Sequence, residues 1–254
     1  MMNVFGADDH LLVISNTIDA EEHQHSFLQL TIALEKECVM DVAGQRFGCT
    51  GIIINSNVVH RLSGSGYPLL LLLIDSTSSL AVSFKRHIND QKYALLSPTT
   101  IMKVREHVQK EYVHVTDSAS YSTFLMQMLA ILGVEFIDTT IVDDRIKAFI
   151  TLLKDCSDAD HSVSLYAQKI GLSNSRLSHL FKENTGISLS GYIVLHKLQK
   201  AVYYIFQGLS ITEAAMSAGF DSPSHLATTS KKLLGMTARD IRKDSVFLQV
   251  SCFR

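Results

Sequence analysis

The sequence has few cysteines, and none of them forms a close pair of the kind that holds a structural metal. The four are scattered, with no Cys-x-x-Cys spacing: Cys38, Cys49, Cys156 and Cys252. This pattern argues against a disulfide scaffold or a zinc finger and favours a reduced compartment. Long apolar runs are also lacking, because the longest, Leu69 to Ile74, is a buried strand at most and cannot span a bilayer. The N-terminus lacks the basic and apolar blocks of a signal peptide, so we expect a cytoplasmic protein with no membrane contact.

Charge is unevenly shared between the two halves of the chain. A length of 254 residues favours two domains, each large enough to bury a core. Residues 1–142 carry 9 Lys or Arg and 15 Asp or Glu, which gives −6, whereas residues 143–243 carry 13 and 9, which gives +4. The C-terminal half is therefore the better candidate for a polyanionic partner, although this excess alone favours nucleic acid only weakly.

Hydrophobic periodicity changes along the chain at the same point as the charge. Residues 11–75 have the pattern of short strands, and SFLQLTIAL places Leu28, Leu30, Ile32 and Leu34 on one face. Residues 99–134 are helical in pattern, with an apolar stripe that includes Phe124, Leu125, Met128 and Leu132. The pattern after Asp143 is helical. We therefore predict a small antiparallel β-barrel followed by two helices, and then an all-helical domain.

Three histidines of the predicted barrel have a spacing that can hold a metal. His23 and His25 precede the long strand and His60 follows the run GIIINSNVV. Alternate residues of a strand point to the same side, so such a set can converge inside a barrel. Gln29 stands where a carboxylate ligand would help. We therefore prefer an effector pocket without metal or plain structural histidines, and predict no metal and no cofactor.

The C-terminal half contains two units of helix, glycine and helix, about 48 residues apart. In SLYAQKIGLSNSRLSHLFKENTG the turn is at Gly171 and Ser173 is the expected N-cap. The outward side of its second helix is polar, as a helix lying in a major groove requires. In the second unit, Gly219 gives the turn, Ser222 offers a cap and Pro223 suits a first helical turn. One rigid helix between the units can place both second helices in successive major grooves about 34 Å apart.

Residues 143–243 resemble the DNA-binding domain of the AraC/XylS family of bacterial transcription regulators. The stretches IGLSNSRLSHLFKENTGISLSGYI and EAAMSAGFDSPSHLATTSKKLLGMTARDI are similar to its two motifs, and HQHSFLQLTIAL with NVVHRL resembles its cupin-type sensor domain. The resemblance implies an α+β protein with a cupin-like sensor domain at 1–137, a linker at 138–142, a double helix-turn-helix domain at 143–243 and a tail at 244–254. It also implies an activator that binds double-stranded DNA and RNA polymerase, responds to a small-molecule effector and forms a homodimer.

Site residues follow from the same resemblance and from the polar helix faces. The predicted DNA contacts are Asn174, Ser175, Arg176, Ser178, His179, Lys182, Ser224, His225, Thr228, Lys231 and Lys232. The predicted effector or metal pocket is His23, His25, Gln29 and His60. The family dimerises through the helices that follow its barrel, which assigns dimerisation to Phe124, Leu125, Met128 and Leu132, although this stripe can equally be internal core.

The second motif departs from the family pattern of Phe-x-Arg-x-Phe-Lys. Thr228 stands where the arginine is usual and Ser230 where a large apolar anchor is usual, and Ala238 replaces a proline. Threonine cannot make the bidentate contact to guanine, which is worth roughly 1–3 kcal/mol of discrimination. We therefore expect the second motif to bind phosphate through Lys231 and Lys232 more than it reads bases.

Two other classes of protein stay open at this point. A metal-dependent cupin enzyme with a helical appendage would need a metal at the three histidines, and the missing acid argues against it. The missing arginine leaves open a second alternative, an interaction protein whose second motif no longer binds DNA and binds another protein instead. The doubled motif favours a regulator that is not an enzyme.

Overall fold

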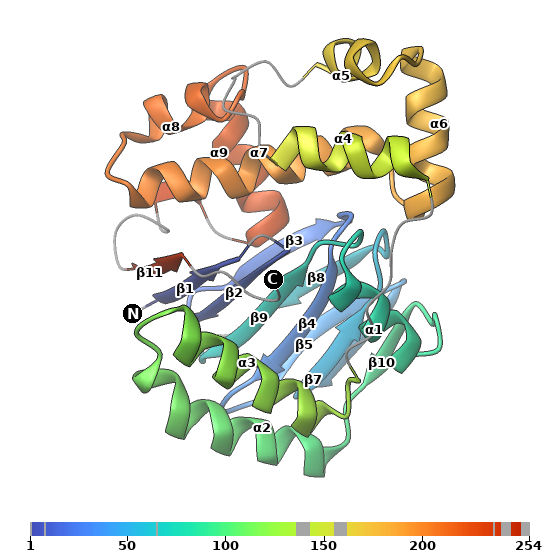
Figure 1. The fold of residues 1–254 in the computed structure, drawn as a ribbon. Coiled ribbons are helices and arrows are strands. Elements are labelled where there is room, and N and C mark those ends of the chain that lie inside the picture. The colour runs from blue at the N-terminus through green and yellow to red at the C-terminus, as the bar shows by residue number, and fades with distance from the viewer. Residues whose placement is uncertain are drawn as a thin grey trace.

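The computed structural model describes residues 2–7, 9–64, 66–135, 143–154, 162–235, 237–239 and 245–249, and Figure 1 shows their arrangement. A β-domain forms the lower part of the view, and a set of helices lies above it. Both parts agree with the predicted α+β fold. Among the described residues, no helix combines the length and the apolar character needed to cross a membrane.

The β-domain is a sandwich of two sheets. Its strands are β1 (Met2–Gly6), β2 (His10–Ser15), β3 (Asp19–His23), β4 (Leu28–Ala33), β5 (Cys38–Val42), β6 (Gln45–Cys49), β7 (Gly51–Ile54), β8 (His60–Ser63), β9 (Leu69–Ile74), β10 (Tyr93–Leu95) and β11 (Ser245–Gln249). The larger sheet has the order β10-β7-β4-β9-β2-β1-β11 and the smaller one β3-β8-β5-β6. All pairs are antiparallel except β1 with β11.

Strand β4 shows how the sequence pattern builds this sandwich. Leu28, Leu30 and Ile32 point to one side of the larger sheet, as their period of two predicts. Ala33 points to the other side, into the core that the two sheets share. Every residue of β4 is buried, because helices cover the face that the smaller sheet does not.

Three helices cover the outer face of the larger sheet: α1 (Ser79–His87), α2 (Pro98–Glu111) and α3 (Ser118–Leu132). Helix α1 was not predicted, whereas α2 and α3 are the expected pair. A capping box at Asp117 begins α3, and Gly133 in the left-handed region ends it.

The stripe on α3 is core of this chain and not a surface for a second one. Phe124, Leu125, Met128 and Leu132 are at most 4% exposed and pack in the cluster between α2, α3 and the sheet. Their predicted role in dimerisation is therefore wrong. The alternative, an internal core, is what the structure shows, because an amphipathic stripe looks the same in sequence whether its own sheet or a partner covers it.

The helical part contains α4 (Asp144–Lys154), α5 (Val163–Ile170), α6 (Asn174–Thr185), α7 (Leu189–Phe206), α8 (Ile211–Ser217) and α9 (Pro223–Leu234). Helices α4 to α6 and the start of α7 have a core of their own around Phe149, Tyr166 and Phe181. The end of α7 with α8 and α9 belongs instead to the same apolar cluster as the interior of the β-sandwich.

Strand β11 joins the C-terminal segment to the β-domain. It pairs in parallel with β1, with Asn3 opposite Val246 and Phe5 opposite Leu248. The predicted separate tail at 244–254 is therefore corrected for residues 245–249, which form an edge strand of the larger sheet (Figure 1). The predicted linker at 138–142 lies outside the described residues.

Candidate nucleic-acid interface

The first helix-turn-helix unit is built as its sequence predicts. Gly171 ends α5 in the left-handed region, and the hydroxyl of Ser173 accepts a hydrogen bond from the backbone N–H of Arg176 at 3.2 Å. The inward side chains Leu177 and Phe181 are fully buried. The ring of Phe181 meets that of Phe149 edge-on, with centroids 5.5 Å apart, so α6 is held rigidly against α4.

The outward face of α6 presents most of the predicted contact residues. The exposed ones are Asn174, Ser175, Arg176, His179 and Lys182. Two of the predicted set have local partners: the Asn174 amide donates to the Ser164 hydroxyl at 2.8 Å, and the half-buried Ser178 hydroxyl donates to the Asn174 carbonyl at 2.9 Å. The structure therefore leaves Ser175, Arg176, His179 and Lys182 as one exposed face of polar and basic groups.

The second unit is also formed, with caps at both of its helices. A capping box of Ser210 and Glu213 begins α8, and the Ser222 hydroxyl accepts from the backbone N–H of His225 at 3.1 Å to begin α9. Pro223 occupies the first turn of α9, where its missing N–H costs nothing. Helix α9 therefore begins where the turn residues predict.

The outward face of α9 has fewer strong hydrogen-bonding groups than the outward face of α6. Ser224, His225, Thr228 and Lys232 are exposed. The His225 ring lies 3.0 Å from an Asp221 carboxylate oxygen and edge-on to Phe220, so part of its polarity is used locally. Ser230 is fully buried, so the small hydroxyl does stand at an inward position.

Lys231 does not lie free on the α9 surface. Its ammonium donates to the backbone carbonyls of Asp19, at 2.9 Å, and Gly235, at 3.0 Å. In this structure the side chain joins α9 to strand β3 and does not reach out for phosphate. The sequence could not show this contact, because it joins residues 212 positions apart. Of the two predicted phosphate lysines, Lys232 is the exposed one.

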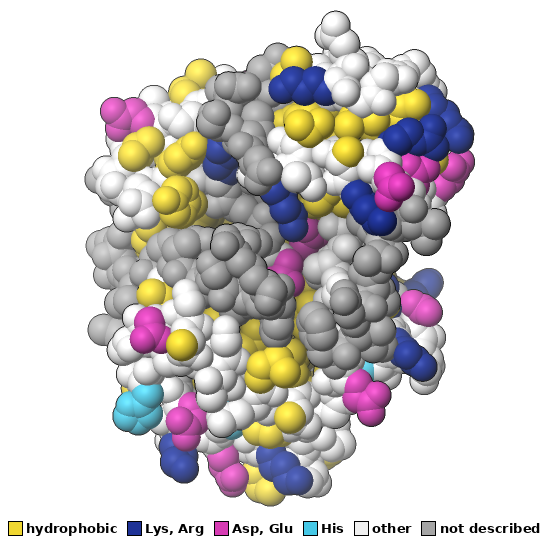
Figure 2. All heavy atoms as spheres, in the orientation of Figure 1, with side chains coloured by type: hydrophobic (Ala, Val, Ile, Leu, Met, Phe, Trp, Pro, Cys, Tyr) yellow, Lys and Arg dark blue, Asp and Glu magenta, His cyan; other side chains and the backbone are white. Residues whose placement is uncertain are grey.

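Helix α7 sets the distance between the two units. It has 18 residues and so spans about 27 Å. Helix α6 packs at its start, and α8 and α9 pack along the remainder. Figure 2 shows several Lys and Arg side chains on the helical part of the face drawn, some of them at the end where Figure 1 places α6. The geometry is that of two polar helix faces held by one rigid connector.

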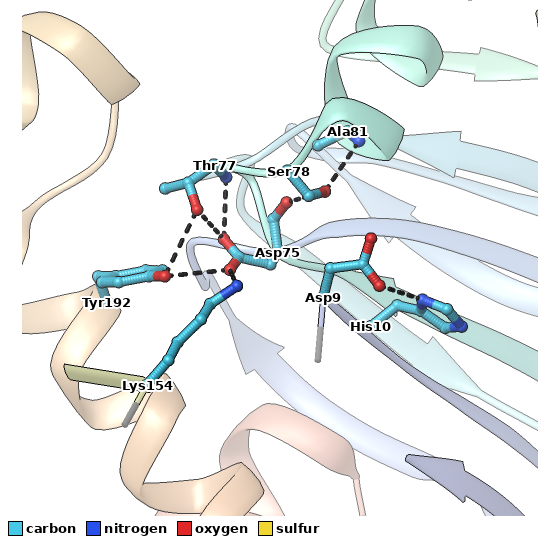
Figure 3. A network of polar contacts seen from close by, with 8 residues as sticks. All are labelled: Asp9, His10, Asp75, Thr77, Ser78, Ala81, Lys154 and Tyr192. Atoms are coloured by element: carbon cyan, nitrogen blue, oxygen red, sulfur yellow. Dashed lines mark hydrogen bonds and ion pairs between the residues drawn. The ribbon is translucent and has the colours of Figure 1, made fainter. Parts of the chain in front are cut away.

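A buried carboxylate connects the first unit to the β-domain (Figure 3). Asp75 follows β9 and is 3% exposed. It accepts hydrogen bonds from Thr77, at 2.9 Å from the backbone and 2.7 Å from the hydroxyl, and from the Tyr192 hydroxyl at 3.1 Å. The Lys154 ammonium lies 3.6 Å away. Burial and the Asp75 charge raise the pKa of Tyr192 well above its usual value. Sequence reasoning missed this junction, which joins three separate segments.

The predicted pocket residues do come together in the structure. His23, His25 and His60 are each at most 6% exposed, and their ring centroids lie 4.4 to 5.2 Å apart. Gln29 lies beside them and binds His25 at 3.1 Å through its side-chain oxygen. Burial, together with the neighbouring rings, lowers the pKa of His25 to about 3 and that of His60 to about 4, so both rings are neutral.

A pocket of about 290 Å³ opens beside these histidines, between the β-domain and the helices. The β-domain contributes Gln24, His25 and Ser26, and the helices contribute Ser188, Ser190, Gly191, Val194, Leu195 and Leu233. The lining combines polar side chains with the apolar Val194, Leu195 and Leu233. Only His25 of the four predicted pocket residues lines it directly.

Known proteins share parts of this sequence and its overall fold. Residues 166–244 match a family of helix-turn-helix domains. The arabinose operon regulatory protein of Escherichia coli (strain K12) is 25% identical over 123 residues, which are 46% of this chain and 42% of that protein. The match thus spans less than half of that relative.

Solved structures of ToxT from Vibrio cholerae have a similar fold over nearly the whole chain. Apo ToxT from strain SCE256 gives a TM-score of 0.60 at 12% identity and covers 91% of this chain and 96% of its own. ToxT from the same strain with an unsaturated fatty acid bound gives 0.54 at 13% identity and covers 92% and 95%.

A β-sandwich joined to two helix-turn-helix units defines a two-domain protein of the helix-turn-helix class. The helix-turn-helix match and the similarity to the arabinose operon regulatory protein agree with the AraC-type double motif that the sequence predicted. The match to helix-turn-helix domains favours a regulator over the alternative of a cupin enzyme.

Proposed function

We propose that this protein regulates transcription by binding double-stranded DNA with α6 and α9. The observation that carries the proposal is the pair of exposed polar helix faces held by α7. A length of about 27 Å along α7, together with the widths of the flanking helices, suits two successive major grooves about 34 Å apart. The match of residues 166–244 to a family of helix-turn-helix domains supports the same function.

Helices α6 and α9 contribute unequally to recognition of the DNA sequence in this proposal. Helix α6 offers His179 and Ser175 for base edges and Arg176 and Lys182 for phosphates or guanine. Apart from Lys232, helix α9 offers only short or locally bound side chains, so it contributes through Lys232 and through shape. The half-site under α6 carries most of the sequence preference.

Binding-site selection with the full chain and randomised duplex DNA tests this division. His179→Ala should relax the base preference of one half-site by about 1–3 kcal/mol and leave the other half-site unchanged. Thr212→Ala is the matched control, because Thr212 is exposed on α8, outside both second helices. A second half-site that is already as sharply specified as the first contradicts the unequal division.

Salt dependence tests DNA binding itself. Arg176 and Lys182 are exposed on α6, Lys232 is exposed on α9, and Arg239 is exposed beyond the end of α9. Each neutralised phosphate steepens the slope of log affinity against log salt by about 0.9. A slope of about −3 to −4 is therefore expected, and affinity that does not change with salt would count against a nucleic-acid interface and favour a protein partner.

The first domain is proposed to sense a small molecule through the pocket beside His25. Its position between the domains supports this, because a ligand there touches both the β-domain and α7. ToxT, which shares the fold, has been solved with an unsaturated fatty acid bound. Footprinting with and without metabolites of cell extracts tests the proposal, and identical footprints would contradict it.

Activation through RNA polymerase, a cytoplasmic location and a homodimer complete the proposal. None of these depends on the α3 stripe, which is core. Light scattering at micromolar concentration tests the dimer, and a reporter gene behind the selected site tests the sign of regulation. Repression of the reporter would overturn the activator role, and a monomer in solution would overturn the dimer.

A further inference from the structure

Three buried imidazoles meet at one end of the smaller sheet. His23, the last residue of β3, is paired across the ladder with His60, the first residue of β8, and His25 lies two residues beyond β3. One nitrogen of each ring points into a common space, and these atoms lie within 4.8 Å of one another. Within the part of the chain that the structure describes, no other set of His, Cys or acidic side chains converges in this way.

Each ring has an inner nitrogen, which faces the common space, and an outer nitrogen, which faces away from it. The hydrogen bonds of the outer nitrogens determine which nitrogen of each ring carries the proton. Nδ1 of His23 lies 2.6 Å from the carbonyl oxygen of Glu21, and Nδ1 of His60 lies 2.8 Å from that of Val58. A carbonyl oxygen only accepts, so both Nδ1 atoms are protonated and both Nε2 atoms present a bare lone pair.

Gln29 fixes His25 in the same way. Its amide nitrogen donates to Thr31 at 2.9 Å, which turns the amide oxygen toward Nε2 of His25, 3.1 Å away. Nε2 of His25 therefore donates, and Nδ1 is the bare acceptor. Among the described residues, the three inner nitrogens have no hydrogen-bond partner. Three acceptors that face one another in a buried space favour an electrophile between them.

In contrast to the sequence-based expectation of no metal, we propose that His23, His25 and His60 bind a divalent transition-metal ion of the zinc class. Neutral imidazoles whose outer N–H groups are held by oxygen atoms are the usual ligands of such ions. Calcium and magnesium are disfavoured, because the cluster offers no oxygen ligand. Zn–N bonds of about 2.0–2.1 Å in a tetrahedron place the nitrogens about 3.4 Å apart, so the rings close by an ångström or so on binding.

The fourth position of this site faces the pocket between the domains. His25 is both a ligand and part of the pocket lining, so a water molecule or a small anion from the pocket can complete the tetrahedron. The ion also crosslinks β3 with β8, and β3 is the strand on which α9 rests. The proposal concerns coordination alone and does not depend on DNA binding.

Cobalt titration of the full chain, stripped with chelator, tests the site directly. We expect one Co²⁺ per chain, the strong visible ligand-field bands of tetrahedral coordination, and loss of these bands when Zn²⁺ is added. His23→Gln, His25→Gln and His60→Gln should each abolish the bands. Gln29→Leu should weaken affinity about 10–100-fold, because it frees the outer nitrogen of one ligand.

His10→Gln is the matched control. His10 is fully buried in the same domain, but both of its ring nitrogens have partners, Asp9 and Tyr121. This variant should keep the cobalt bands. Wild-type protein that shows no tetrahedral bands and retains no stoichiometric Zn²⁺ after desalting would overturn the proposal, whatever the variants do. Bands that persist in all three ligand variants would overturn it as well.

Discussion

Removing a single hydroxyl at Tyr192 should measurably weaken the junction between the first helix-turn-helix unit and the β-domain. Tyr192→Phe deletes the donor that reaches Asp75 at 3.1 Å and keeps the ring that packs against Phe181, with centroids 5.1 Å apart. A hydrogen bond to a charged group contributes about 1.5–3 kcal/mol. Asp75 keeps both bonds from Thr77, so it is not left unpaired, and we expect the lower end, about 1.5 kcal/mol.

Urea unfolding followed by circular dichroism and by fluorescence measures this loss of free energy. Tyr203→Phe is the control, because Tyr203 is an exposed tyrosine of the same helix and should change stability by less than about 0.5 kcal/mol. If Tyr192→Phe falls within the same 0.5 kcal/mol, the hydroxyl does not hold the junction and the reasoning fails.

The dependence of the free energy of unfolding on pH at alkaline pH tests the role of Tyr192 independently. The pKa of Tyr192 is raised in the folded state, so its contribution is fully present below the unfolded value of about 10 and is lost as pH rises toward the folded value. Wild-type protein should therefore lose up to about 1.4 kcal/mol per pH unit more than Tyr192→Phe above pH 10. Parallel curves for the two proteins would show that burial does not hold this proton.

Three further changes test the packing and the second motif. Leu125→Ala should cost about 2–5 kcal/mol of stability and leave the oligomeric state in light scattering unchanged, because Leu125 is core; a shift to smaller particles would restore its role in dimerisation. Gly235→Ala should cost about 1–3 kcal/mol more in thermal unfolding than Gly186→Ala, because both glycines have positive φ but only at Gly235 would a Cβ meet Ala20, at 3.0 Å; equal losses would contradict the close approach. Thr228→Arg should create a guanine preference in the second half-site of a binding-site selection, and an unchanged site would show that α9 does not enter the groove.

The helical domain was largely predictable from sequence because its signals are local. Ser173 and Ser222 cap the helices that they were expected to cap, and Gly171 adopts the left-handed conformation expected at a turn. Strand β4 was predictable for a similar reason, since a period of two needs only its own residues. Local sequence signals are enough to predict an element when the residues that begin and end it lie within or next to that element.

The features that sequence reasoning missed depend on contacts between distant segments. Strand β11 is defined by its pairing with β1, some 240 positions earlier, and its short apolar run gives no sign of a partner. Lys231, which the sequence predicted to bind phosphate, donates instead to the Asp19 carbonyl. The histidine spacing predicted that the rings could meet, but only the structure shows which nitrogens lack a partner.

The two helix-turn-helix units are attached to the β-domain by different forces. Helix α9 rests on β3 through an apolar cluster continuous with the sandwich core, together with the bond from Lys231 to Asp19. The first unit has a separate core and meets the β-domain through the polar junction at Asp75. Exposing apolar surface to water costs roughly 25 cal/mol per Å², whereas polar groups at a junction regain hydrogen bonds to water when it opens. The junction at Asp75 is therefore the easier of the two to open, and α6, which we propose reads the DNA sequence, is the helix that gains freedom to move when it does.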